Sequence, residues 1–325
     1  MTWVSEHRLR ILVWHAHGSW TSAFVRGRHE YLLPALPGGG PWGLGRADRA
    51  WPNSAREVKP ADLGEPDLVV LQRPEELDLL RRWTGLRAGR DVPAVYVEHN
   101  TPTGDVPRTR HFLAEENEIP IVQVTHFNRL MWDTGRAPVE VIEHGVVDPG
   151  FRYTGEERSA GVVINEPVRR GRATGTDLLP AFARVAPLDV YGMGVEKLDT
   201  LGGRIRPHGD LGQEELHTSL ARRRLYLHTP RWTSLGLSLV EAMHLGMPVV
   251  ALACTEAVRA VPLEAGFVSA DVAELAGAVR ALIAEPDLAH RMGKYAREFA
   301  LANYGLEAFL HRWDKLLHWV TGGNR

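Results

Sequence analysis

Short apolar runs alternate along the chain with segments of helical periodicity. In the first half, the runs predict strands at residues 10–14, 67–71, 94–98, 121–125 and 140–143. The pattern restarts after residue 150 and predicts strands at residues 162–165, 188–191, 205–208, 225–228 and 249–252. Helical patterns are clearest at residues 75–83, 126–134, 272–284, 287–301 and 306–320. This alternation is typical of parallel sheets covered by helices, so we expect two Rossmann-like halves joined near residues 146–160. The stretch 36–60 is rich in Gly, Pro and Trp and predicts an irregular surface excursion.

The most informative pattern lies in residues 229–251, TPRWTSLGLSLVEAMHLGMPVVA, which predicts a loop, a helix and a strand. The polar exceptions on the predicted helix are spaced by three and form one stripe: Ser238, Glu241 and His244. A helix that is otherwise apolar all round is expected to be buried. A carboxylate on such a helix needs a partner, because an unpaired buried charge is costly.

The ends of this helix carry the signals of a cap and a stop. Ser234 is predicted as the N-cap and Gly246 as the stop. The free amides and the dipole at a helix N-terminus attract phosphate, and Glu241, about two turns further on, offers an acceptor to hydroxyl groups. One element therefore suits the diphosphate and the ribose of a nucleotide. The alternative is that Glu241 faces solvent or caps a neighbouring loop.

This segment resembles the signature of retaining glycosyltransferases of the GT-B fold, in particular the large family 4. Members carry a Glu-x7-Glu pattern around Gly-Phe-Gly-Leu, followed by Glu-Ala-Met and Gly-x-Pro-Val-Val. The resemblance implies that Glu241 binds the ribose hydroxyls. It also implies contacts to the donor phosphates from the loop residues Ser234, Leu235, Gly236 and Leu237. The position of the first glutamate, which contacts the donor sugar in the family, holds Thr233 here.

The resemblance implies an α/β architecture of the GT-B type. In that fold two Rossmann-like domains face a central cleft, and a C-terminal helix crosses back to the N-terminal domain. We expect an acceptor domain at residues 1–150, a nucleotide-sugar donor domain at 151–303 and the returning helix at 304–325.

The placement of histidines gives a second indication of a site. Seven of the 15 histidines fall at or just beyond the ends of predicted strands: His15, His17, His99, His126, His144, His208 and His228. Open α/β sheets bind ligands outside the carboxyl ends of their strands, so these rings point to the expected cleft. Any single one of them could instead cap a strand end and bond the backbone.

His99 is the histidine expected to act directly in catalysis. It resembles the histidine that family members place against the donor sugar, and a neutral imidazole can polarise a hydroxyl near neutral pH. Its neighbour Glu98 is not expected to pair with it, because successive side chains on a strand point in opposite directions.

The loop after the first strand occupies the place of the family's Gly-rich loop. Of the usual glycine pair only Gly18 is present, and the resemblance implies that its backbone approaches the diphosphate. We expect the acceptor side of the site to be lined by His17, Ser19 and Trp20. The alternative for Trp20 is that it begins the first helix and packs in the core.

An arginine run follows the first strand of the second half. The family carries an arginine and a lysine here, and both neutralise the donor diphosphate. Arg169 falls where the family arginine is expected and is predicted to be catalytic as well. Thr174 falls where the lysine is expected, so Arg172 or Arg170 is the expected replacement, because a guanidinium binds phosphate oxygens in a bidentate way. A solvated surface loop is the alternative.

Composition and charge narrow the class of protein. With 325 residues, 44% of them hydrophobic and 24% charged, the chain is typical of a globular protein with two domains. Its formal net charge of −2 argues against general nucleic-acid binding. The single Cys254 excludes an intrachain disulfide and a multi-cysteine metal site. Near the N-terminus the apolar run is too short for a signal peptide or a membrane span, which predicts a cytoplasmic location.

These patterns and the resemblance predict a retaining, metal-independent hexosyltransferase that moves a sugar from a nucleoside diphosphate sugar to a hydroxyl acceptor. UDP is the favoured nucleotide and GDP the alternative; no cofactor, no metal and no nucleic acid are expected, and membrane association is not indicated. No Asp-x-Asp motif is present to hold a metal between the phosphates. Arginines and helix amides are therefore expected to neutralise them.

Three other functions fit parts of the pattern. A nucleotide-sugar epimerase or hydrolase would use the histidines without an acceptor. A metal enzyme would use His15 and His17, which as alternate strand residues share a face. A non-catalytic nucleotide-sugar binder is favoured by the replacements at Thr233 and Thr174.

Overall fold

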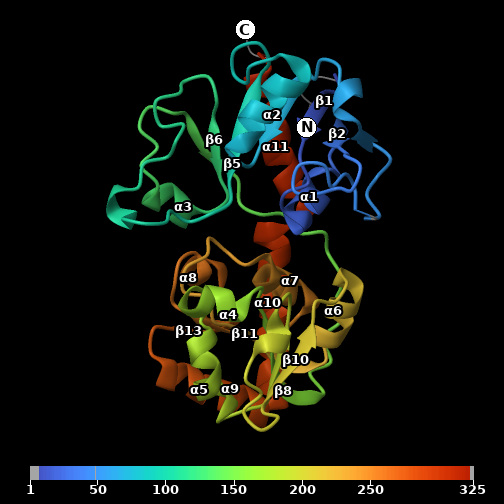
Figure 1. Cartoon of the computed structure of the whole chain (residues 1–325). Helices are drawn as coiled ribbons and strands as arrows, with labels where there is room; N and C mark the ends of the chain where they lie inside the picture. The colour runs from blue at the N-terminus through green and yellow to red at the C-terminus, as the bar shows by residue number, and fades with distance from the viewer. Residues whose placement is uncertain (1–6, 48, 323–325) are drawn as a thin grey trace. The chain divides into compact units, whose positions relative to one another are not determined.

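The computed structural model describes residues 7–47 and 49–322, and its contacts divide the chain into two compact units (Figure 1). The N-terminal unit comprises residues 1–147 together with 306–325, and the C-terminal unit comprises residues 148–305. Each unit is built on one parallel sheet. Among the described residues, no helix is both long and apolar enough to cross a membrane.

The N-terminal unit contains a seven-stranded sheet in which every neighbouring pair is parallel. The chain begins in the middle of the sheet, builds outward to one edge, and then returns to continue on the other side of β1. In sheet order the strands are β3 (Ala55–Val58), β2 (Glu30–Pro34), β1 (Arg10–Val13), β4 (Leu68–Leu71), β5 (Ala94–Glu98), β6 (Ile121–Gln123) and β7 (Val139–Val141).

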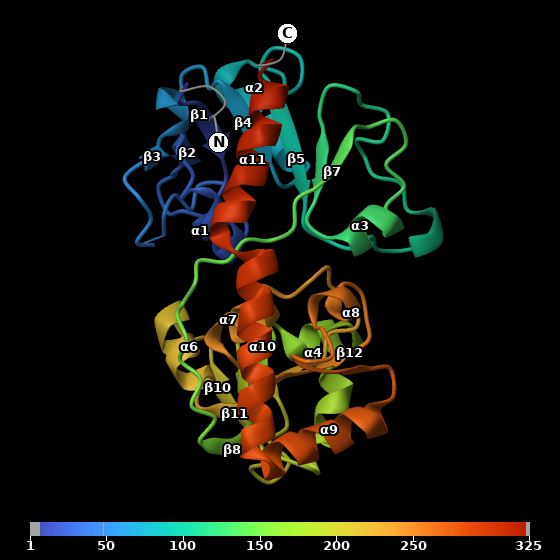
Figure 2. The same ribbon diagram turned by 180° about the vertical axis from the view of Figure 1, so that it is seen from behind.

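Four α-helices belong to this unit: α1 (Gly18–Phe24), α2 (Glu75–Thr84), α3 (His126–Met131) and α11 (Leu306–Val320). Figure 2 shows α11, the last helix, lying along the N-terminal unit. Trp313 on α11 packs edge-on against Trp20 and Phe24 of α1, with ring centroids 5.7 and 4.9 Å apart. The expected return of the C-terminal helix to the N-terminal domain is therefore confirmed.

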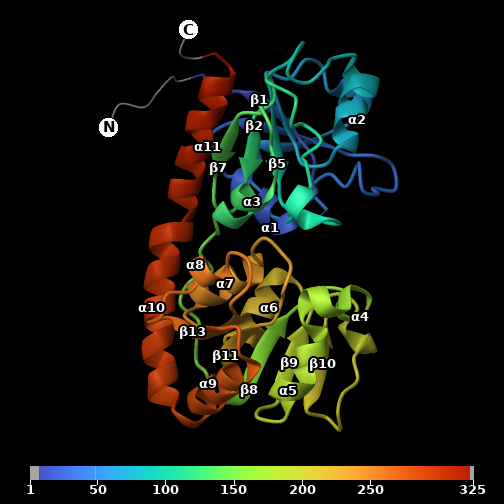
Figure 3. The same ribbon diagram turned by 90° about the vertical axis from the view of Figure 1, so that its left-hand side faces the viewer.

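The C-terminal unit contains a six-stranded parallel sheet. In sheet order its strands are β10 (Ile205–Gly209), β9 (Leu188–Tyr191), β8 (Glu157–Val163), β11 (Arg223–His228), β12 (Val249–Leu252) and β13 (Gly266–Ser269). Its α-helices are α4 (Pro167–Arg170), α5 (Leu179–Ala183), α6 (Gln213–Leu220), α7 (Leu237–Leu245), α8 (Ala257–Ala260), α9 (Val272–Ala284) and α10 (Pro286–Tyr304). Figure 3 shows α10 running along one side of this unit, where it contacts α7 and α9.

Two parts of the strand prediction were wrong or incomplete. No strand was predicted at β2, β3 or β13, and β3 falls inside the stretch expected to be irregular. Strand β8 begins and ends earlier than the predicted 162–165. Edge strands such as β3, with Arg56 and Glu57 exposed, bury too few side chains to read as apolar runs.

Candidate active site

Both sheets reverse their strand order at one point, and most of the predicted site residues follow the strands on either side of these points. His99 follows β5, which is one strand further along the sheet. In the C-terminal unit the reversal lies between β8 and β11; in the N-terminal unit it lies between β1 and β4. Open α/β sheets bind ligands at such switch points, outside the carboxyl ends of the strands.

The helix α7 is buried, as its apolar pattern predicted, and every residue from Leu239 to Leu245 is buried. It begins at Leu237 with Gly236 as its N-cap, so the prediction that Ser234 caps it was wrong. Gly236 has an extended backbone conformation, so the helix cannot begin before Leu237. At this point the backbone passes close to the ring of His228: a Cβ atom on Gly236 would lie 3.0 Å from Cε1 of His228. The helix ends at Gly246, which adopts the left-handed conformation expected of a stop.

The carboxylate of Glu241 is buried and has partners, as the cost of an unpaired buried charge requires. His217 on α6 places Nε2 3.2 Å from one carboxylate oxygen, and the side-chain amide of Gln213 donates to the other at 3.4 Å. The alternative that Glu241 faces bulk solvent is therefore wrong. Neither partner was predicted, because α6 is distant in sequence.

The arginine loop after β8 is folded into short helical turns. Arg169 lies on α4, its side chain is 72% exposed, and its Nε is 3.5 Å from the carboxylate of Glu166. Glu166 has a positive φ of 53°, which is a strained conformation for a residue with a side chain. Such strain is often found at functional sites.

Arg172 does not stand alone at this edge. Its guanidinium donates a hydrogen bond to the carboxylate of Asp177 at 2.9 Å. Arg231 donates two hydrogen bonds to the same carboxylate, at 2.6 and 3.0 Å. The Arg231 hydrogen bond is the main reason why the pKa of Asp177 is lowered. Two guanidinium groups share one carboxylate, which leaves one uncompensated positive charge. Sequence reasoning did not single out Arg231, although it lies within the segment 229–251.

Backbone contacts join the arginine loop to the loop that precedes α7. The amides of Arg231 and Trp232 donate to the carbonyl of Ala173 at 2.9 and 3.2 Å. A Cβ atom on Gly175 would lie 2.1 Å from the carbonyl oxygen of Thr229, so only glycine permits this approach. The two loops that carry the predicted phosphate-binding residues of this unit are therefore held together.

Three of the seven histidines gather at the carboxyl edge of the N-terminal sheet: His17, His99 and His144. The rings of His17 and His99 lie 4.0 Å apart between centroids, and the edge of Trp20 packs against His99 at 5.2 Å. Burial lowers the pKa of all three imidazoles, with the neighbouring rings adding to the effect in His99 and His144. The cluster is therefore uncharged at neutral pH.

A hydrogen bond from His99 to the side-chain oxygen of Gln72 defines which ring nitrogen of His99 carries the proton. The Gln72 amide nitrogen donates to the carbonyl of Trp14 at 2.7 Å, so its oxygen faces His99 Nε2 at 3.0 Å. A neutral His99 must then carry its proton on Nε2, which makes Nδ1 the acceptor atom. As expected, Glu98 does not pair with His99; its carboxylate lies 3.3 Å from His111.

The remaining candidates of the N-terminal unit have separate surroundings. Trp20 is 1% exposed and packs in the core, as the alternative prediction for it proposed. His15 places Nδ1 2.9 Å from the carbonyl of Gly45 and packs on Trp51, whereas His17 packs on His99. No group of three or more metal-binding side chains occurs among the residues that the structure describes.

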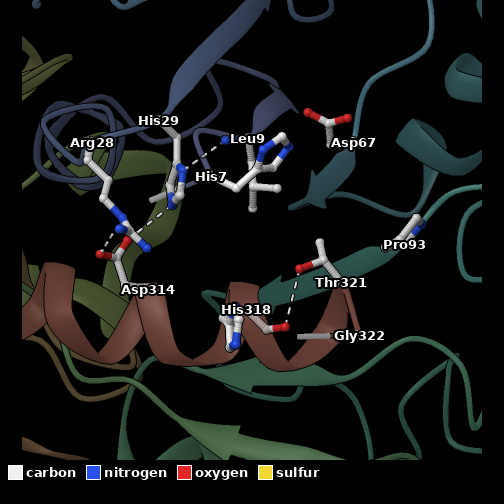
Figure 4. A pocket seen from close by; sticks show the side chains of 10 residues that line it. All are labelled: His7, Leu9, Arg28, His29, Asp67, Pro93, Asp314, His318, Thr321 and Gly322. Atoms are coloured by element: carbon white, nitrogen blue, oxygen red, sulfur yellow. Dashed lines mark hydrogen bonds and ion pairs between the residues drawn. The ribbon is translucent and has the colours of Figure 1, made fainter. Parts of the chain in front are cut away.

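A cavity of about 370 Å³ lies in the N-terminal unit, near the amino ends of its strands (Figure 4). His29 lines it and is 2% exposed; its Nδ1 accepts from the amide of Leu9 at 3.2 Å, and its Nε2 lies 3.1 Å from Asp314 of α11. These contacts connect the segment before β2 to α11, so the burial of His29 is accounted for by a structural role.

The buried histidines predict a loss of stability in mild acid. The pKa of His144 is lowered from 6.5 to about 4 by burial, and His17 and His228 behave alike. In the unfolded chain these histidines become protonated below about pH 6.5, whereas in the folded chain they become protonated only near pH 4. Their contribution to stability is therefore full above pH 6.5 and falls with pH, by on the order of 1–2 kcal/mol per ring at pH 5.

Thermal unfolding between pH 7 and 5 at constant ionic strength checks this expectation. The melting temperature should fall with pH, and His144→Gln should flatten the slope because one titrating ring is gone. A melting temperature independent of pH over this range contradicts the assignment of neutral rings.

The comparisons with known proteins concern one segment of the chain and its fold. Residues 199–299, which include α7, match the family model described as Glycosyl transferases group 1. The fold is similar to HepE from Anabaena (16% identity, TM-score 0.74, 96% of this chain and 100% of that chain). It is also similar to sucrose-phosphate synthase from Thermosynechococcus elongatus (15% identity, TM-score 0.71, 96% and 99%). No curated protein matches the sequence.

A third similar structure is TarM from S. aureus (18% identity, TM-score 0.61), where the match covers 77% of this chain and 55% of that one. This chain therefore spans about half the length of TarM. Low identities of this kind show the fold alone, and the family match is confined to residues 199–299. The fold is thus of the predicted GT-B type, and the segment that matches the glycosyl transferases group 1 model lies in the C-terminal unit.

Proposed function

We propose that this protein is a retaining, metal-independent glycosyltransferase that uses a UDP-sugar, with a GDP-sugar as the alternative donor. The C-terminal unit would bind the donor, and the N-terminal unit would bind a hydroxyl acceptor. The observation that carries the proposal is the buried helix α7, whose amino end and Glu241 adjoin an arginine loop at the β8–β11 switch point.

The reaction requires stabilisation of a diphosphate leaving group. The bond from the anomeric carbon to the phosphate oxygen breaks, a bond to the acceptor oxygen forms on the same face, and the acceptor proton passes to the leaving phosphate. Arg169, Arg172 and the amides that open α7 would neutralise the charge that develops on the diphosphate. Arg231 joins them, because it holds the carboxylate next to Arg172.

The histidine cluster is the feature of the N-terminal unit that we assign to orienting the acceptor hydroxyl. We assign this task to His99 in particular, because burial keeps its ring neutral near pH 7 and its Nε2 donates to Gln72 at 3.0 Å, which fixes the ring. Gly18, Ser19 and His17 follow β1 at the same edge of the sheet. The choice of UDP is supported by HepE, which was crystallised with UDP-glucose and with UDP.

Titration calorimetry with UDP and GDP, followed by a panel of donors and acceptors, tests this function. UDP binding together with sugar transfer and an α-configured product from an α-configured donor is the expected result. Nucleotide binding without turnover on any acceptor would instead favour the non-catalytic binder, which the threonines at positions 233 and 174 suggest. Turnover that depends on a tightly bound metal contradicts the mechanism.

Replacement of Glu241 tests the nucleotide site directly. Glu241→Gln keeps the shape of the side chain but removes the charge that accepts the ribose hydroxyls, so UDP should bind about tenfold more weakly or worse. Glu214→Gln is the matched control, because Glu214 lies on the neighbouring helix α6 with a side chain that is 78% exposed. Unchanged UDP affinity in Glu241→Gln removes the ribose assignment.

A further inference from the structure

The switch point of the N-terminal sheet carries two guanidinium groups that the proposed transfer does not use. Arg73 comes two residues after the end of β4, and Arg49 lies in the loop between β2 and β3. The loop that carries His17 and Gly18 follows β1, the neighbour of β4 at the point where the strand order reverses. Arg73 therefore follows a strand that borders the switch point, and Arg49 lies near Gly18 in the loop after β1, the other bordering strand. Open sheets bind ligands at such a point.

Arg73 is held in place by three contacts that leave one end of its guanidinium unused. Its Nε donates to Glu76 at 2.7 Å, its Nη1 donates to the carbonyl of Pro41 at 2.7 Å, and the plane lies 4.1 Å over the ring of Trp42. The buried Nη2 atom has no hydrogen-bond partner among the described residues. A buried donor of this kind is costly to leave unpaired, so a fixed, unpaired guanidinium end indicates a ligand.

Arg49 lies across the backbone of the predicted acceptor loop. A Cβ atom on Gly18 would come within 2.7 Å of its Nη2 atom, so the absence of a side chain at position 18 is what admits the guanidinium. Within residues 7–47 and 49–322, the side chain of Arg49 makes no hydrogen bond or ion pair. Its charge is therefore not neutralised by the part of the chain that the structure describes.

The surrounding groups leave this region positive. Burial is the main cause that lowers the pKa of His15, and the charge of Arg49 lowers it further. Burial also lowers the pKa of His17, and the charge of Arg73 adds to that effect. Both imidazoles are therefore neutral near pH 7. Glu76 is the carboxylate that contacts Arg73, and burial raises its own pKa to about 7. In the part of the chain that the structure describes, no ion pair thus balances Arg49.

We propose that Arg49 and Arg73 form an oxyanion subsite beside the acceptor loop, and that the acceptor is a sugar bearing a phosphate or carboxylate group. A guanidinium binds either group through two parallel hydrogen bonds, and such charge-assisted bonds are about twice as strong as neutral ones. The identity of the molecule as an acceptor rests on the proposed function. The subsite itself rests on the geometry of the N-terminal unit.

Titration of the full-length protein with matched sugars tests the subsite. Glucose 6-phosphate, glucuronate, glucose and inorganic phosphate are each titrated with UDP present, and UDP is titrated separately. At least one anionic sugar should bind about tenfold or more tightly than glucose, and the tighter of the two identifies the charged group as phosphate or carboxylate. Arg49→Gln should abolish this preference, and added salt should weaken it.

The control variant is Arg56→Gln, which removes an exposed arginine from the edge strand β3 of the same unit and should change nothing. Arg73→Gln is a second test of the subsite, but it deprives Glu76 of its partner and so requires a check of folding by circular dichroism. Arg49→Gln breaks no observed bond and keeps the test valid if Arg73→Gln does not fold.

Two results would overturn the subsite. One is binding of glucose as tight as that of both anionic sugars, with inorganic phosphate binding independent of Arg49. The other is a loss of UDP affinity in Arg49→Gln with no change for the anionic sugars, which would assign this guanidinium to the donor. If UDP does not bind and no sugar is transferred, the proposed function fails, whereas Arg49-dependent binding of glucose 6-phosphate would still establish the subsite.

Discussion

Arg169→Ala should lower turnover by about 10²- to 10³-fold while the protein remains folded. The proposed role of this arginine is to neutralise charge that develops on the leaving diphosphate, and removal of one such preorganised donor has an effect of this size. Its structural role is small, because the side chain is 72% exposed and its contact with Glu166 is a surface ion pair. The melting temperature should therefore stay within about 2 °C of that of the parent protein.

Steady-state kinetics with the identified donor, together with calorimetric melting, checks this pair of expectations. The matched control is Arg222→Ala, an exposed arginine that precedes β11 and pairs with Glu156 and Glu157 at the amino end of the sheet. Its turnover should equal that of the parent. If Arg169→Ala lowers the melting temperature but not the turnover, the arginine is structural and the phosphate assignment is lost.

His99→Asn should reduce kcat by on the order of 10²-fold or more, with a smaller effect on donor affinity. The ring contacts His17, Trp20 and Gln72, which fix its position. Loss of a positioned group that acts on a reacting hydroxyl has an effect of this order. Because burial holds the pKa of His99 well below its ordinary value, activity should not fall as pH decreases from 8 to 6 through titration of this ring.

A second buried imidazole in the same unit separates catalysis from folding. His111 is 2% exposed and contacts Glu98, the residue next to His99 whose side chain points the other way. His111→Asn should destabilise the protein without changing the kcat of the folded fraction. Equal losses of kcat in the two variants would show that His99 acts only through the integrity of the sheet edge.

The sequence located the parts of the fold that are buried on both faces. Strands β4, β5, β9 and β12 were predicted within one residue at each end, because each consists mostly of apolar residues. Strand β13 was not predicted, since three of its four residues are only partly buried and the pattern of a short edge strand resembles that of a loop. The burial of α7 followed from its composition alone.

The hydrogen-bond partners of the site residues could not be predicted from the sequence. It showed that the carboxylate of Glu241 requires a partner, but not that α6 supplies His217, which lies 24 residues earlier. The sequence showed that histidines follow several strands, but it did not show that one of them, His99, forms a hydrogen bond with Gln72. Pairing of this kind depends on the strand order, and local patterns carry no information about which strands become neighbours.

What the sequence by itself determined is the sequence of elements, the buried carboxylate and the arginine loop, because periodicity and the cost of burial act locally. The tertiary structure decided which groups meet. It brought Arg231 to Asp177, set the start of α7 at Leu237 through the approach of Gly236 to His228, and laid Arg49 across Gly18. These contacts arise only after the sheets form, since they join loops that follow different strands of a parallel sheet.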